Sequence, residues 1–295
     1  MRGKILLVVA VVALLLGACG VQEEAGQNTS LVEKAGKAPY YTVLADALEA
    51  CGPNQYVVAE FYTDWCIWCK TLDSVVFSDP KAIDFFTNDM ILARINAEVD
   101  TASRNKYYAR AYPTSIVLDK AGNEVDRFVG FDSTDAYLKA IVDYTHGIGT
   151  LQDLLSKAEG TTDRSLMMQI VDKYKYRGMF NETNEWCDRV ITAGDPTDSL
   201  SGEARMAQAY MLRKAEDLDG ALAAFAAIAK DFDSYHGREA VIWEGIVLEQ
   251  KNDTAAAVKM YQSFIDKFGT IDDEGAEYCK QQIEELSNPP DESEH

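Results

Sequence analysis

The chain has 295 residues, 47% of them hydrophobic, and carries 48 acidic against 28 basic residues, for a formal charge of -20. This length and apolar content suffice for two domains, each with its own core. The excess of acidic residues argues against a nucleic-acid-binding protein and against electrostatic attachment to anionic lipid.

The N-terminus has the layout of an export signal. Two basic residues precede an apolar run from Ile5 to Leu16, which is too short to span a bilayer comfortably. The run ends in Leu16-Gly17-Ala18-Cys19, which resembles the lipobox of bacterial lipoproteins. This resemblance implies that residues 1–18 are removed and that Cys19 is lipidated; an ordinary signal peptide that happens to contain a cysteine is the alternative.

The polar, glycine-bearing composition of residues 19–38 predicts a flexible tether. Together with the signal, it leads us to expect a lipid-anchored protein of the bacterial cell envelope. Such a protein faces away from the cytoplasm, on the periplasmic side if the cell is Gram-negative.

The stretch Cys66-Ile67-Trp68-Cys69 follows a strand predicted over residues 56–62 and is expected to begin a helix. At that position the free N–H groups and the helix dipole lower the pKa of a thiol from about 8.5 towards about 7 or less. The resulting Cys66 thiolate can attack a disulfide, and Cys69 can then resolve the mixed disulfide. The spacing predicts a redox-active pair that exchanges disulfides without a cofactor.

Two other interpretations of the cysteine pair are weaker. A zinc site needs four ligands, and the other cysteines and the histidines do not supply them at short spacing. These residues are Cys19, Cys51, Cys187, Cys279, His146, His236 and His295. A purely structural Cys66–Cys69 disulfide would close so short a loop that it would constrain little chain entropy.

Trp65-Cys66-Ile67-Trp68-Cys69-Lys70, with Glu60 in the preceding strand, resembles the thioredoxin family. With Val76-Phe77-Ser78-Asp79-Pro80 downstream, it looks like the C-terminal thioredoxin-like domain of DsbD-type disulfide interchange proteins. The resemblance covers about residues 40 to 145. It implies an α/β domain over residues 39–146, with a central mixed sheet flanked by helices, and it favours reduction over oxidation of substrate disulfides.

The resemblance also assigns roles to individual residues. Glu60 stands where the family has Asp, and a buried carboxyl with a raised pKa would suit a proton relay to Cys69; the alternative is that Glu60 points outward from an edge strand. Pro113 would be cis and guide the substrate strand. Substrate contacts are assigned to residues around the cysteines, the proline and a later glycine. These are Trp65, Ile67, Trp68, Tyr112, Thr114 and Gly130.

Residues 150–287 lack strand signals and are predicted to be all helical. The pattern Ala221, Phe225, Ile228 recurs 36 residues later as Ala257, Tyr261, Phe264, and a weaker copy surrounds Trp186. The spacing resembles tetratricopeptide repeats, which stack into a solenoid with a concave binding surface; a non-repeating helical bundle is the alternative.

Three cysteines remain outside the redox pair. Cys51, Cys187 and Cys279 stand in apolar settings, where buried free thiols are expected, with a third redox thiol at Cys51 and a disulfide between Cys187 and Cys279 as alternatives. The tail, residues 288–295, is predicted to be disordered.

The sequence thus favours a membrane-anchored thiol–disulfide oxidoreductase that acts on thiols and disulfides of exported proteins. Its helical repeats would bind substrate or partner, and a membrane electron donor would restore its dithiol. A scaffold lipoprotein with the same two domains and little redox turnover is the second hypothesis.

Overall fold

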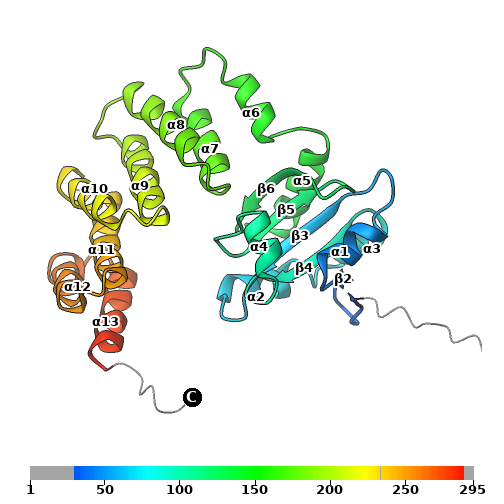
Figure 1. Cartoon of the computed structure of the whole chain (residues 1–295), viewed down its shortest axis with the longest axis horizontal. Coiled ribbons are helices and arrows are strands. Elements are labelled where there is room, and N and C mark those ends of the chain that lie inside the picture. Colours follow the sequence, from blue (N-terminus) through cyan, green and yellow to red (C-terminus); the bar gives the residue numbers. More distant parts are fainter. Residues whose placement is uncertain (1–29, 233, 289–295) are drawn as a thin grey trace, which may run out of the picture.

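The computed structural model describes residues 30–232 and 234–288 and contains an α/β part followed by an all-helical part (Figure 1). This confirms the predicted fold class. The predicted signal segment, Cys19 and residues 289–295 of the tail lie outside the described residues. No helix among the described residues is long and apolar enough to cross a membrane.

The α/β part holds six strands and five helices. The strands are β1 (Leu31–Val32), β2 (Tyr40–Tyr41), β3 (Val57–Tyr62), β4 (Ile91–Asn96), β5 (Thr114–Leu118) and β6 (Glu124–Val129). The helices are α1 (Leu44–Ala50), α2 (Ile67–Val75), α3 (Pro80–Asn88), α4 (Thr101–Lys106) and α5 (Thr134–Thr145).

The strands form one mixed sheet in the order β1-β2-β4-β3-β5-β6. β4 runs parallel to β2 and β3, whereas β5 is antiparallel to β3 and β6. β3 is therefore an inner strand with a partner on each side. Because side chains alternate along a strand, β3 contributes Val57, Ala59 and Phe61 to the core on one face and Val58 to the core on the other.

The N-terminal edge of the sheet corrects the predicted tether over residues 19–38. From Ser30 onward the chain is part of the domain, because β1 pairs with β2 at the sheet edge and the Ala38 amide donates to the Phe77 carbonyl at 2.8 Å. Ala38 is buried. Backbone hydrogen bonds hold this segment on the sheet. Such bonds do not depend on the side chains, so the sequence shows no apolar periodicity that would predict the attachment.

The described residues from 150 onward form eight helices and no strand. They are α6 (Leu151–Lys157), α7 (Arg164–Lys175), α8 (Phe180–Thr192), α9 (Ser199–Lys214), α10 (Leu218–Asp231), α11 (Tyr235–Gln250), α12 (Thr254–Phe268) and α13 (Asp273–Ser287). Successive helices from α7 onward pack as neighbours, and α7, α9, α11 and α13 also contact one another in series. These four helices form an inner layer, and the region curves around the α/β part (Figure 1).

The residues of the 36-residue sequence pattern occupy equivalent places in α10 and α12. Ala221 and Phe225 are fully buried in one core cluster, as Ala257 and Tyr261 are in the next. Cys187 and Cys279 are buried free thiols in separate core clusters, so they form no disulfide with each other. Burial raises the pKa of the Cys187 thiol to about 12 and that of Cys279 to about 11.

A buried ion cluster joins the two parts. Asp126 of β6 is fully buried, and its Oδ1 accepts from Lys173 Nζ at 2.7 Å and from Arg177 Nη2 at 2.9 Å. Its Oδ2 accepts from the Leu151 amide, the first residue of α6. Burial alone would raise the pKa of Asp126, but the two cations outweigh burial and hold the pKa below its ordinary value.

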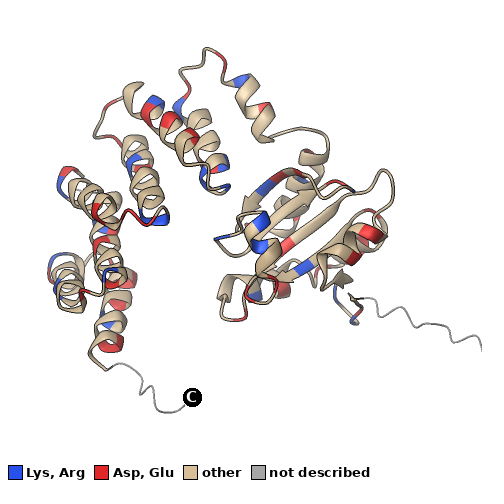
Figure 2. Ribbon diagram, viewed as in Figure 1, with Lys and Arg blue, Asp and Glu red and all other residues tan. Residues whose placement is uncertain are grey.

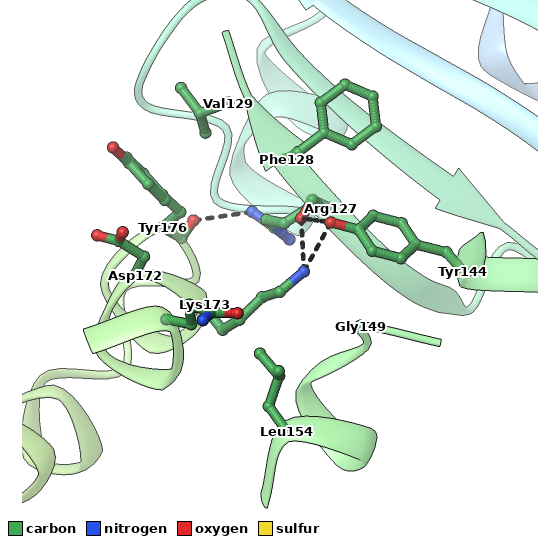
Figure 3. A pocket seen from close by; sticks show the side chains of 10 residues that line it. Arg127, Phe128, Val129, Tyr144, Gly149, Leu154, Asp172, Lys173 and Tyr176 are labelled. Atoms are coloured by element: carbon green, nitrogen blue, oxygen red, sulfur yellow. Dashed lines mark hydrogen bonds between the residues drawn. The ribbon is translucent and has the colours of Figure 1, made fainter. Parts of the chain in front are cut away.

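Neighbouring contacts strengthen this junction (Figure 3). Lys173 Nζ also donates to the Tyr144 hydroxyl at 2.8 Å, and Arg127 Nη1 donates to the Tyr176 carbonyl at 2.9 Å. Beside them lies the turn at Gly178, which has a φ of +68°. A Cβ added there would lie 2.5 Å from the ring of Tyr108, so the glycine lets the two parts approach closely.

We predict that Asp126→Asn destabilises the chain by about 3–5 kcal/mol at neutral pH, because Lys173 loses its one carboxylate partner in the described chain and Arg177 keeps only Glu124. The free energy of unfolding in urea measures this loss. Since the folded-state pKa of Asp126 is lowered, its stabilisation is present above the ordinary value of 3.8 and disappears as the pH falls through the folded pKa. The difference between wild type and variant should therefore shrink in acid.

The matched control is Asp135→Asn, which breaks the exposed Lys81–Asp135 ion pair. It should change the stability little at any pH. An Asp126→Asn protein as stable as this control would contradict the role given to the cluster.

Candidate functional site

The two cysteines lie at the start of α2 and form a disulfide. Cys66 is the N-cap residue of the helix, and its Sγ accepts a hydrogen bond from the Cys69 amide at 3.0 Å. On reduction, the same amide and the helix dipole would face a Cys66 thiolate and stabilise it. The side chain of Cys69 lies deeper, with 2% exposure against 5% for Cys66. This geometry suits Cys66 as the attacking sulfur and Cys69 as the resolving one.

Large apolar side chains surround the cysteine pair at the surface. Trp65, Ile67 and Trp68 are 67%, 70% and 65% exposed. The Trp65 indole donates to Glu98 Oε1 at 2.9 Å, which orients its ring. A cluster of exposed apolar side chains is typical of a surface that contacts another protein.

The loop before β5 lies next to this surface. Its Tyr112–Pro113 peptide bond is cis, and the Tyr112 ring meets the Trp65 ring edge-on at 6.0 Å between centroids. Gly130, with a φ of +75°, donates its amide to the Pro113 carbonyl at 2.9 Å. The loop residues assigned to substrate by resemblance, Tyr112 and Pro113, therefore lie beside a residue that flanks the cysteines.

Thr114 does not fit its assigned substrate contact. It is 1% exposed and its hydroxyl donates to the Ala111 carbonyl. Its backbone lies between β3 and β6, in register with Phe61 and Val129. The side chain thus belongs to the interior, because Thr114 is the first residue of an inner strand.

Glu60 is fully buried within β3 and is paired with Arg94 on the adjacent strand β4. Arg94 Nε donates to Glu60 Oε2 at 3.0 Å, whereas Glu60 Oε1 has no partner among the described residues. Burial raises the pKa of Glu60, and the attraction of Arg94 only partly offsets it. The carboxyl points into the protein rather than outward from an edge, since β3 is an inner strand.

Arg94 links this acid to the cysteine site. Its guanidinium also pairs with Asp73 of α2 and lies 5.0 Å from the centroid of the Phe77 ring. Arg94 and Cys69 both line a cavity of about 240 Å³, and Arg94 is at the same time the ion-pair partner of the buried Glu60.

Sequence reasoning missed Arg94 and Asp73. A signal for Arg94 was present, because one charged residue interrupts the apolar strand from Met90 to Ile95, as Glu60 interrupts its own strand. The pairing of Glu60 with Arg94 could not be predicted, because it depends on the register of two parallel strands and joins residues that are 34 positions apart. Asp73 had no comparable signal, since it is a polar residue on a helix.

A family model described as a thioredoxin-like domain matches residues 45–145. Residues 45–145 form a thioredoxin-like domain. The chain is 28% identical to the thiol:disulfide interchange protein DsbD of Haemophilus influenzae strain PittEE over 127 residues, which are 40% of this chain and 22% of that protein. It is 28% identical to thioredoxin of Chlamydia caviae over 85 residues, which are 29% of this chain and 78% of that protein.

Among solved structures, a variant thioredoxin of Halobacterium salinarum is 25% identical, covering 39% of this chain and 96% of that chain with a TM-score of 0.31. The chain spans about a fifth of the length of the DsbD relatives. The family model ends before α6 and leaves the helical region unmatched.

We predict that Glu60→Gln stabilises the chain at pH 8 relative to wild type and has less effect at pH 4. A raised folded-state pKa means that the contribution of Glu60 is fully present below its ordinary value of 4.5 and is lost as the pH rises through the folded pKa. Gln mimics the protonated acid at every pH. Urea unfolding at both pH values measures the effect, and Glu49→Gln on the exposed face of α1 is the control. A variant less stable than wild type at pH 8 would show that the Arg94 pair outweighs burial.

Proposed function

We propose that the chain is a thiol–disulfide oxidoreductase that reduces disulfides of exported proteins in the bacterial cell envelope, held at a membrane by lipid on Cys19. The observation that carries this proposal is the position of the Cys66 sulfur at the N-cap of α2. It accepts a hydrogen bond from the Cys69 amide, and exposed apolar side chains surround it. Such a sulfur is a stabilised thiolate when reduced, and the surface around it is open to a protein substrate.

The reaction consists of two exchanges. The Cys66 thiolate attacks one sulfur of a substrate disulfide, so that a mixed disulfide forms and the other substrate sulfur leaves as a thiolate. The Cys69 thiolate then attacks Cys66 Sγ and releases the second substrate sulfur. The substrate gains two electrons and the pair becomes the Cys66–Cys69 disulfide, so an electron donor, in our proposal one in the membrane, must return the pair to the dithiol.

Glu60 would accept the proton of Cys69 before the second exchange. Its raised pKa, and an Oε1 that has no partner within the described residues, suit a group that gains and loses a proton. The 240 Å³ cavity between Cys69 and Arg94 has room for water to carry the proton part of the way.

The substrate backbone would lie against the loop at Tyr112 and Pro113, with Trp65, Ile67 and Trp68 on its other side. The helical region would act as repeats of the tetratricopeptide type, whose inner layer binds the substrate or a partner protein. The serial contacts of α7, α9, α11 and α13 support this part of the proposal.

We predict that Cys66→Ser abolishes disulfide exchange, because serine supplies no thiolate nucleophile. Cys69→Ser should accumulate mixed disulfides, because the resolving thiol is gone. Thiol trapping followed by non-reducing electrophoresis distinguishes the two variants. The control is Cys279→Ala, which removes a buried thiol from the distant helix α13 and should leave exchange unchanged. Exchange that persists in Cys66→Ser protein would overturn the redox function and leave the scaffold hypothesis.

The direction of electron flow is tested by the reduction potential of the pair, titrated against glutathione buffers. We expect a value near that of thioredoxin, about -270 mV, for a reductant. A value near that of DsbA, about -120 mV, would mean an oxidant and would overturn the proposed direction.

A further inference from the structure

A cleft of about 500 Å³ lies between the thioredoxin-like domain and the helical region. Residues of three inner helices line it: Lys175 at the end of α7, Tyr210 of α9 and Trp243 of α11. The thioredoxin-like domain contributes Ala111, which directly precedes the Tyr112–Pro113 peptide. A polypeptide that lies along this loop is therefore directly next to the cleft.

Aromatic rings form much of the cleft wall. Tyr210 and Trp243 meet edge-on at 5.7 Å, and Tyr176 and the 60% exposed Tyr235 line the same cleft. Rings of this kind offer apolar area at low entropic cost and accept an extended chain of varied sequence.

Three cations converge at the end of the cleft nearest the thioredoxin-like domain, and none has an ion-pair partner among residues 30–232 and 234–288. Arg110 and Lys214 line a second, smaller cavity that shares Ala111 and Tyr210 with the cleft. Arg213 lies beside Lys214, with its guanidinium 5.1 Å from the Tyr210 ring and 4.8 Å from the Trp243 ring. Its Nε is buried and unpartnered among the described residues.

The ends of α7 and α9 are basic, in a chain with a net charge of -20 (Figure 2). Burial lowers the pKa of Lys214, and repulsion from Arg213 and Arg110 lowers it further. An anion placed among these groups would relieve this repulsion. Lys175 adds less, because it already pairs with Asp172.

Two acids also line the cleft: Glu203, whose charge acts on Lys175, and Glu239, which accepts from the Trp243 indole at 3.4 Å. His236 lines it as well, and its Nδ1 is buried without a partner in the described chain. A ligand's negative charges are therefore favoured beside Arg110, Arg213 and Lys214, in the adjoining cavity next to the thioredoxin-like domain, rather than beside these two acids.

We propose that this cleft binds an extended, acidic segment of the polypeptide whose disulfide Cys66 attacks. Its aspartate and glutamate side chains pair with Arg110, Arg213 and Lys214, and its apolar side chains pack on Tyr210 and Trp243. The proposal rests on the proposed redox function for the identity of the ligand. It gives the helical region a defined task, which is to select acidic substrates and deliver them to the cysteines.

Peptide binding to the full chain carrying Cys66→Ser and Cys69→Ser tests the cleft without any redox step. The probe is a fluorescein-labelled peptide of glutamate, aspartate and phenylalanine, and a second peptide has lysine in place of every acid. We expect the acidic peptide to bind at least about tenfold more tightly, with an affinity that falls as salt rises.

Lys214→Glu should weaken binding of the acidic peptide by about tenfold or more, because it places like charges together. Lys214→Gln removes the charge with less disturbance and should weaken binding by a smaller factor. The matched control is Lys259→Glu on the exposed face of α12, which makes the same change of charge away from the cleft and should leave the affinity unchanged. Equal affinities for the two peptides, or equal losses in Lys214→Glu and Lys259→Glu, would overturn the proposal.

A parallel assay of the wild-type chain with glutathione disulfide separates the two hypotheses. Selective binding of the acidic peptide without any disulfide exchange would preserve the ligand preference of the cleft and overturn the redox function. Exchange with glutathione disulfide but equal binding of both peptides would overturn the cleft and preserve the redox function.

Discussion

The buried carboxylate of Asp126 is the constraint on which the arrangement of this protein depends. It lies on β6 of the thioredoxin-like domain and accepts from Lys173 and Arg177 of the helical region. A charge so buried is stable only while its partners stay in place, so the cluster fixes the position of α7 beside β6. That position brings Gly178 against Tyr108 and places the end of α7 beside the loop that leads to Pro113.

The redox site follows from local geometry at the other end of the sheet. Helix α2 begins at the cysteines, and its dipole and the Cys69 amide act on Cys66. Beneath it, Glu60 and Arg94 form a buried pair, and one oxygen of the carboxyl has no partner among the residues that the structure describes. The site thus combines a sulfur that the helix would stabilise as a thiolate with a titratable acid in the interior, a combination that suits disulfide exchange.

The cleft connects these two features. The loop at Tyr112 and Pro113 contacts Trp65 on one side, and its preceding residue, Ala111, lines the cleft on the other. In our proposal, a substrate would therefore meet recognition and chemistry on one continuous surface. The cations beside the cleft, which have no ion-pair partner in the described part of the chain, repel one another, and in our proposal a bound acidic segment relieves that repulsion.

The sequence by itself determined the fold class, the Cys66–Cys69 site and the all-helical second half, because these depend on local spacing. A Cys-x-x-Cys at a helix start and a repeat of apolar residues along a helix are fixed by neighbours in the chain. Only the tertiary structure decided the pairing of Glu60 with Arg94, the interior position of Thr114 and the attachment of residues 30–38 to the sheet. It alone revealed the Asp126 cluster and the cleft with its adjoining cations. These contacts join residues that are distant in sequence, and strand register and helix packing, which no local pattern encodes, bring them together.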